Sequence, residues 1–232
     1  MPRPKPGCEK VPLGKGHFIQ GKDIFKTEIA TIELPEWNRH IEISENREKD
    51  VTNINFEKLK RIIVAMAKKK GMTPSEFASK TVFEHSHIGN IVPSEGDLAT
   101  LIALNLTWGF EKAKIYRVDG KTKKIIGHLE LKFNFDKNIL SKLKHDPADI
   151  KKNLPNLKQI GIPVNTMGLY VGICEAVDNY VTAVKLQKPS WPKDYTKKYA
   201  NMLVLQKLGF EYKFVPAEGY NILDEDMDFH KI

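Results

Sequence analysis

The stretch that decides the predicted fold runs from residue 56 to residue 91 and reads FEKLKRIIVAMAKKKGMTPSEFASKTVFEHSHIGNI. Its first half repeats apolar side chains every three or four residues, which is typical of an amphipathic helix. Three lysines at 68–70 followed by Gly71 indicate the helix end, because cations favour the C-terminal dipole and glycine adopts a left-handed cap. Residues 73–76 (TPSE) then predict a second helix that starts with a capping box.

The sequence on both sides of this stretch is β-like. Residues 23–44 hold short apolar runs, and residues 45–55 read as a polar loop. After Phe110 the apolar period changes to two, and two such runs flank Asp119-Gly120, which is a strong hairpin-turn signal. A second hairpin is predicted over 167–187, across Asp178-Asn179. Further helices are expected over 98–106, 136–158 and 194–208, with a last strand over 210–215.

These signals predict an α+β protein in which a helical unit is flanked by antiparallel β-hairpins. The expected divisions are a flexible arm at 1–16, a β segment at 17–55, a helical unit at 56–109 and an α+β region with two hairpins and an acidic tail at 110–232.

Composition limits the function classes. The chain has 232 residues, with 37 Lys and Arg against 29 Asp and Glu, for a net charge of +8. Residues 110–160 carry thirteen basic and six acidic side chains (+7), residues 56–109 only +2, and residues 217–232 carry −4. The positive middle third favours a polyanion partner.

No apolar run approaches 18 residues and no signal peptide is present, so we expect no membrane partner. Two distant cysteines, Cys8 and Cys174, argue against a disulfide framework and favour a reducing, cytoplasmic setting.

A resemblance to a known family rests on residues 56–108. Gly71 ends the first helix, Phe77-Ala78 lie in the second, and apolar residues follow at Phe83, Ile88 and Ile91. The segment thereby resembles the lambda-repressor/Cro class of helix-turn-helix domain. The resemblance implies a recognition helix near 84–91 that binds duplex DNA in a regulatory role, without a cofactor. A homodimer is left open.

The residues expected to contact DNA fall into two groups. Base edges would be read by Ser86, His87 and Asn90. Phosphates would be contacted by Lys68, Lys69, Lys70, Lys80, Lys112, Lys114, Lys121, Lys123 and Lys124.

Two enzyme classes remain open as alternatives. Asp119, Glu130 and Lys132 have the spacing of a Mg²⁺-dependent PD-(D/E)XK-like nuclease. Residues 200–212 (ANMLVLQKLGFEY) resemble the closing helix and strand of GNAT acyltransferases, which use acetyl-CoA, although no pyrophosphate loop is visible between 135 and 201.

No metal site is predicted. His85 and His87 are two residues apart, and on the expected helix they would point to different sides.

Overall fold

The computed structural model describes residues 8–13, 16–21, 27–37, 39–47, 52–135 and 167–220. In that part of the chain the strands are β1 (Cys8–Leu13), β2 (Gly16–Gly21), β3 (Ala30–Leu34), β4 (Arg39–Glu42), β5 (Ser44–Arg47), β6 (Thr52–Ile54), β7 (Val82–Ile88), β8 (Lys112–Asp119), β9 (Lys124–Lys132) and β10 (Glu211–Pro216). The helices are η1 (Pro35–Trp37), α1 (Phe56–Lys70), α2 (Pro74–Ser79), α3 (Glu95–Trp108), α6 (Met167–Gln187) and α7 (Lys193–Leu208).

A six-stranded mixed sheet forms the centre of the fold, in the order β10-β9-β8-β7-β3-β4. The parallel pair is β7 and β8, which α3 connects, and the other neighbours are antiparallel. Strands from all three segments predicted after the N-terminal arm therefore pair in one sheet. Two further strand pairs, β1–β2 and β5–β6, lie outside it.

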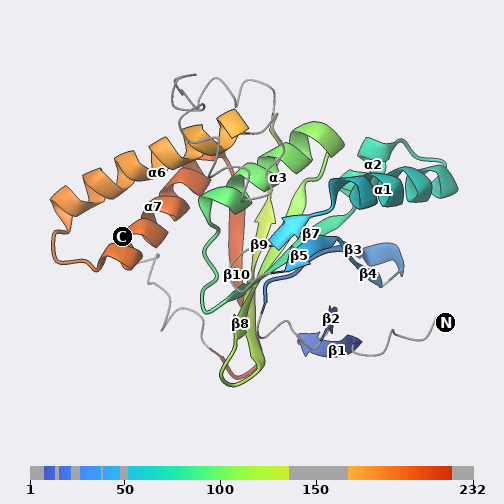
Figure 1. Ribbon diagram of the computed structural model, residues 1–232, viewed down its shortest axis with the longest axis horizontal. Coiled ribbons are helices and arrows are strands. Elements are labelled where there is room, and N and C mark those ends of the chain that lie inside the picture. Colours follow the sequence, from blue (N-terminus) through green and yellow to red (C-terminus); the bar gives the residue numbers. More distant parts are fainter. Residues whose placement is uncertain are drawn as a thin grey trace.

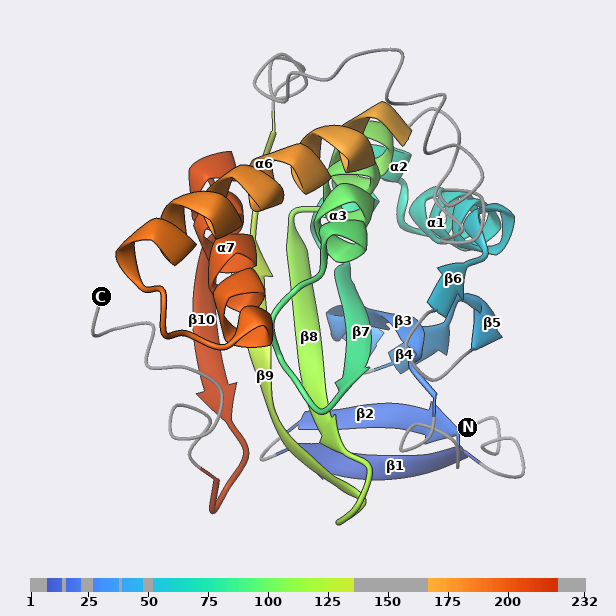
Figure 2. The same cartoon turned by 60° about the vertical axis from the view of Figure 1, so that its left-hand side comes forward.

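Helices α3, α6 and α7 cover one face of the sheet, and α1 and α2 lie beside its β3–β4 edge (Figures 1 and 2). One apolar core joins these layers. It includes Ile32, Phe83, Ile115 and Leu129 from the sheet and Ile63, Leu101, Ile102, Ile173 and Leu205 from the helices. The α+β class predicted from the sequence is confirmed.

The local helix signals of residues 56–79 are also confirmed. α1 ends at Lys70 with Gly71 in the left-handed conformation (φ 65°). The capping box of α2 is present, because Thr73 Oγ1 accepts from the Glu76 N–H and Glu76 Oε2 accepts from the Thr73 N–H, at 3.2 and 2.8 Å.

A helix-turn-helix unit is not confirmed. Where the recognition helix was expected, Val82–Ile88 forms the strand β7, hydrogen-bonded to β3 on one side and to β8 on the other. The physical reason lies in the sequence Thr81-Val82-Phe83, because β-branched and aromatic side chains favour a strand, and in the two neighbouring strands that pair with it. α2 is only six residues long.

One of the two predicted hairpins is confirmed and the other is not. β8 and β9 pair antiparallel from Lys112–Lys132 to Asp119–Lys124. Residues 167–187 instead form the continuous helix α6. Its buried Leu169, Ile173 and Val177 recur every four residues, a helical spacing that a two-residue turn at 178–179 would have broken.

Near the C-terminus, the predicted helix and strand appear as α7 and β10, separated by Gly209 at φ 92°. The helix expected over 136–158 and the acidic residues after 220 lie outside the described residues. Part of the predicted arm, Cys8–Leu13, pairs with β2.

Candidate functional sites

The β8–β9 hairpin concentrates positive charge. Its 21 residues, 112–132, hold seven basic and two acidic side chains, so the hairpin accounts for +5 of the chain's +8. Both views show it projecting past the end of β7 (Figures 1 and 2). At the hairpin tip, defined here as residues 119–124, Lys121, Lys123 and Lys124 are all exposed. Five of the lysines predicted to contact DNA therefore lie on one structural element, together with Lys132 from the proposed nuclease set.

The two acidic side chains of the hairpin, Asp119 and Glu130, both contact polar groups of the protein itself. Asp119 accepts hydrogen bonds from the Lys121 N–H at 2.8 Å and from Thr122 Oγ1 at 2.7 Å, and the Thr122 hydroxyl is the main cause that lowers the pKa of Asp119. Glu130 Oε1 lies 3.1 Å from His128 Nε2. Asp119 stays ionised, so the tip carries three positive charges against one negative charge.

The lysines at the base of the hairpin, away from its turn, differ in the charge of their neighbours. Lys112 and Lys132 are direct cross-strand partners and both are exposed. Like charges directly opposite each other on a sheet are destabilising. Lys114 differs, since its Nζ lies 2.6 Å from Glu33 Oε2 on β3.

The three residues predicted as a nuclease centre do not come together. Glu130 is the cross-strand partner of Lys114, whereas Asp119 lies five residues further along β8, at the start of the turn. At the rise of an antiparallel strand this is a separation of about 17 Å between backbone positions. One divalent ion cannot bridge Asp119 and Glu130 at that distance, because metal–oxygen bonds are about 2.0–2.6 Å long.

The predicted base-reading residues are not presented to DNA. Ser86 is fully buried and its Oγ accepts the Ile29 N–H at 2.9 Å, while His87 is 5% exposed. Asn90 is half-buried and its Oδ1 accepts the Val92 N–H at 3.0 Å. The prediction that Ser86 and His87 enter a major groove is therefore wrong, because both lie on a central strand of the sheet.

Lysines 68–70 and Lys80 are exposed near the C-terminal ends of α1 and α2. Lys70 Nζ lies 2.7 Å from Glu36 Oε2 and 4.5 Å from the Trp37 ring centroid. Both views place α1 and α2 away from the hairpin tip (Figures 1 and 2). These four lysines and the tip lysines do not form one continuous surface.

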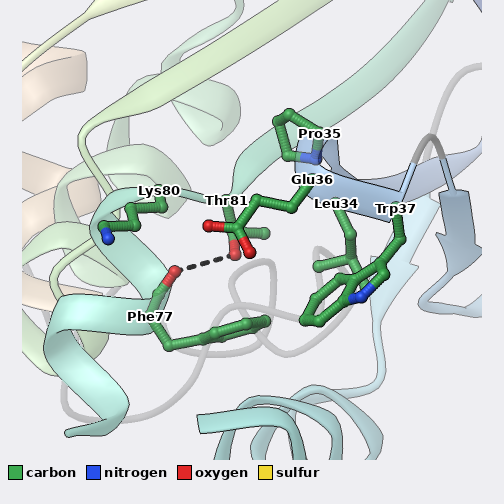
Figure 3. Close-up of a pocket in the computed structure, with 7 residues that line it drawn as sticks. All are labelled: Leu34, Pro35, Glu36, Trp37, Phe77, Lys80 and Thr81. Carbon is green, nitrogen blue, oxygen red and sulfur yellow. Dashed lines mark hydrogen bonds between the residues drawn. The ribbon is translucent and has the colours of Figure 1, made fainter. Parts of the chain in front are cut away.

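A small hollow lies between η1 and α2 (Figure 3). It is lined by Leu34, Pro35, Glu36, Trp37, Phe77, Lys80 and Thr81 and has an empty volume of about 220 Å³. Thr81 Oγ1 donates to the Phe77 carbonyl at 3.0 Å within it. This volume includes space open to solvent, and Lys70 already pairs with Glu36, so the hollow is a poor binding site for a small molecule.

Alternate residues of β7 make polar clusters on both faces of the sheet. On the face opposite α3, Glu84 is fully buried and accepts from Thr31 Oγ1 at 2.7 Å and from Tyr116 Oη at 2.9 Å. His40 Nδ1 lies 2.7 Å from the same carboxylate. Burial and the Glu84 charge raise the pKa of Tyr116, so this hydroxyl stays protonated and donates. Three donors to one carboxylate make this a saturated buried network.

On the face towards α3, His85 and His87 meet two carboxylates, and we call Glu28, His85, His87 and Asp97 the histidine cluster. His85 Nε2 lies 3.4 Å from Glu28 Oε2 and 3.4 Å from Asp97 Oδ1, and His87 Nε2 lies 3.1 Å from Asp97 Oδ2. Exposure of these side chains is 8% and 6% for the histidines and 12% and 16% for Glu28 and Asp97. The cluster is nearly buried, and its carboxylates form the side nearest to solvent.

Three elements position this cluster. Residues i and i+2 of a strand share a face, so β7 directs both histidines to the same side. Ala30 is the cross-strand partner of His85, and Glu28 lies two residues before it on the same chain. Asp97 is the third residue of α3, held by Ser94 through a capping box.

The neighbouring charges within the cluster shift the pKa values of His85 and Asp97 towards the charged forms. Burial opposes protonation of His85, but Asp97 and Glu28 outweigh burial and raise its pKa to about 8. Burial also opposes ionisation of Asp97, yet His87 and His85 hold its pKa well below the usual range. The sequence prediction missed this cluster because it assumed a helix for residues 84–91, where i and i+2 diverge.

Comparison with protein-family models finds no match for this chain, and comparison with curated proteins also finds none. The segment that resembles an acyltransferase forms a helix and a strand as expected. Residues 136–166, which are part of the region that would hold a pyrophosphate loop, lie outside the described residues. In the described part of the chain, none of the helices has the length and apolar character needed to cross a membrane.

Proposed function

We propose that this protein binds duplex DNA through the β8–β9 hairpin. The observation that carries the proposal is that the 21 residues of the hairpin hold +5 of the chain's +8. The tip, with Lys121, Lys123 and Lys124 exposed, extends past the end of β7 (Figure 2). Phosphate contacts supply most of the affinity of non-specific DNA binding.

The shape of the element supports the same partner. β8 pairs with β7 as far as Val118 and β9 pairs with β10 from Gly127, so the hairpin is two-stranded only at its tip. A two-stranded antiparallel ribbon fits the major groove of B-DNA, which is about 12 Å wide. The tip presents Lys121, Lys123 and Lys124 with the exposed Thr122 between them. Insertion of the tip brings these lysines to the phosphates on both sides of the groove.

The chemistry of the hairpin also indicates how selective the binding is. Lysine contacts to phosphate carry no direct sequence information, and Thr122 is the single exposed hydroxyl at the tip. Ser86 and His87 are buried and contribute no base contact. We therefore expect an affinity that depends strongly on salt and weakly on sequence.

The test compares two variants with the same change in net charge. Lys121→Glu, Lys123→Glu and Lys124→Glu together reverse the tip, and Lys60→Glu, Lys69→Glu and Lys193→Glu reverse three exposed lysines elsewhere. In a mobility-shift assay with duplex DNA the tip variant loses affinity by about tenfold or more, and the control variant loses much less. Equal losses in the two variants would show that only total charge matters. Tighter binding to single-stranded DNA or RNA than to the duplex would contradict the proposed partner.

A further inference from the structure

We propose that Glu28, His85 and His87 bind one divalent transition-metal ion, with Zn²⁺ as the preferred ion, and that Asp97 positions His87 for it. Each of the three ligand residues offers an atom that lies within 4.8 Å of those of the other two. This site lies on the helix-covered side of β7 and does not depend on DNA binding by the hairpin.

The hydrogen bonds of His85 assign its nitrogens. Nδ1 lies 3.1 Å from the Ile29 carbonyl oxygen, which can only accept, so Nδ1 carries a proton. Nε2 then points between Glu28 Oε2 and Asp97 Oδ1. Without a metal, a proton on Nε2 is the cation between these two carboxylate oxygens. A metal ion at this position displaces that proton and is bound by the electron pair of Nε2 and by the Glu28 carboxylate.

The distances favour a metal ion over a proton at that position. A charge-assisted N–H to carboxylate hydrogen bond is about 2.7–2.9 Å long, and both contacts of His85 Nε2 are 3.4 Å. Ligands on a tetrahedral Zn²⁺ with bonds of about 2.0–2.1 Å lie about 3.3–3.4 Å apart. The 3.4 Å between His85 Nε2 and Glu28 Oε2, the two proposed ligand atoms, therefore matches neighbouring ligands of a metal more closely than a direct ion pair.

His87 supplies a second, independent observation. Its Nδ1 is buried and has no hydrogen-bond partner in the described part of the chain. Its Nε2 lies 3.1 Å from Asp97 Oδ2. Coordination through Nδ1 gives both nitrogens a partner, because Nε2–H then donates to Asp97 as in carboxylate–histidine–metal triads.

The donor set and its charge indicate the class of ion. Two imidazoles and a carboxylate suit Zn²⁺ and similar transition metals, whereas Mg²⁺ and Ca²⁺ prefer oxygen ligands. With neutral histidines, Glu28 and Asp97 contribute a charge of −2, which a divalent ion neutralises in a site less than one-fifth exposed. Three protein ligands also leave one tetrahedral position for water or another ligand.

The test measures Zn²⁺ binding to the full chain by competition with a chromophoric chelator, after removal of bound metal. The wild type binds one equivalent and gains thermal stability, by mass action on the folded state. Glu28→Gln and His87→Gln lose at least about a hundredfold in affinity, and Asp97→Asn loses about ten- to a hundredfold. Co²⁺ in place of Zn²⁺ gives the visible absorption of a tetrahedral nitrogen–oxygen site.

The matched control is His128→Gln. His128 Nε2 lies 3.1 Å from Glu130 Oε1, so it also forms a histidine–carboxylate pair, but it lies outside the cluster. This variant keeps wild-type Zn²⁺ affinity. Circular dichroism checks the fold of each variant. If His87→Gln, a change at a buried residue, unfolds the protein, the Zn²⁺ affinity of Glu28→Gln is the deciding measurement. The proposal is overturned if the wild type binds no Zn²⁺, or if folded Glu28→Gln binds it as tightly as the wild type.

Discussion

Lys112 and Lys132 are direct partners across β8 and β9, and both side chains are exposed on the same face of the sheet. Lys132 has Glu211 of β10 as its partner on the other side, whereas Lys112 has Val82 of β7. The repulsion at Lys112 is therefore not offset by a cross-strand carboxylate. This like-charge pair at the base of the hairpin therefore costs stability.

The first prediction follows from this asymmetry. Lys112→Glu replaces a like-charge pair by an opposite-charge pair, and we expect the free energy of unfolding to rise by about 0.2–1 kcal/mol. Lys132→Glu is the control, since it gains Lys112 as a partner but then faces Glu211, and no net gain is expected. Urea unfolding measures both. A larger gain from Lys132→Glu would contradict the cross-strand register.

A second prediction concerns the backbone of the tip. Lys123 has φ 54°, the left-handed conformation that costs a residue with a side chain about 1–2 kcal/mol. Lys123→Gly relieves this strain, and we expect a gain in unfolding free energy of up to about 1 kcal/mol. Lys121→Gly removes the same charge without relieving a positive φ, so it should not stabilise. Equal effects of the two changes in thermal unfolding would argue against a strained tip.

The third prediction addresses the start of α3. Ser94 Oγ accepts the Asp97 N–H at 3.2 Å, and Asp97 Oδ2 accepts the Ser94 N–H at 2.7 Å. Ser94→Ala removes one half of this capping box and should lower the free energy of unfolding by about 0.5–2 kcal/mol. Ser190→Ala, at an exposed turn position, is the control and should change it little. An unchanged urea midpoint for Ser94→Ala would show that the cap does not stabilise α3.

A fourth prediction separates a DNA-binding protein from the nuclease alternative. Because Asp119 and Glu130 lie at different levels of the hairpin, Glu130→Ala should change no Mg²⁺-dependent cleavage of DNA. The same change removes a carboxylate from the basic hairpin, so duplex affinity should stay equal or rise slightly. Cleavage that is present in the wild type and lost in Glu130→Ala would restore the nuclease hypothesis.

The fifth prediction concerns Cys174 on α6. Burial, with further contributions from Glu95 and Asp178, outweighs the Tyr170 hydroxyl and raises the pKa of the Cys174 thiol to about 11. A raised thiol pKa means that the protonated, unreactive form dominates at neutral pH, with about 0.1% thiolate at pH 8. In a Cys8→Ser chain, reaction with a disulfide reagent should be slow at pH 8 and accelerate about tenfold per pH unit up to pH 10. Rapid, pH-independent labelling at pH 7 would contradict a raised thiol pKa at this half-buried position.

Local signals in the sequence predicted local structure well. The ends of α1 and α2 depend on Gly71 and on the Thr73–Glu76 capping box, and all of these groups lie within a few residues of one another. The β8–β9 hairpin is similar, because its turn at Asp119 is also encoded locally. Such interactions can be predicted from the sequence because they do not depend on residues that are distant along the chain.

The secondary structure of residues 82–91 could not be predicted from local signals in the same way. Phe83, Ile88 and Ile91 fit the spacing of a helix, but β3 and β8 supply the hydrogen bonds that make 82–88 a strand, and those strands are distant in the sequence. This one difference changed the predicted site. On a strand, His85 and His87 share a face and meet Glu28 and Asp97, which are separated from them along the chain.

The salt dependence of duplex binding tests the central claim most directly. The logarithm of the binding constant is measured against the logarithm of salt concentration for the wild type, the tip variant (Lys121→Glu, Lys123→Glu, Lys124→Glu) and the control variant (Lys60→Glu, Lys69→Glu, Lys193→Glu). Each phosphate contact contributes about −0.9 to the slope. We predict a wild-type slope of about −3 or steeper, a slope shallower by about 2.7 for the tip variant, and a wild-type slope for the control. A tip variant with the wild-type slope would contradict DNA binding through the β8–β9 hairpin.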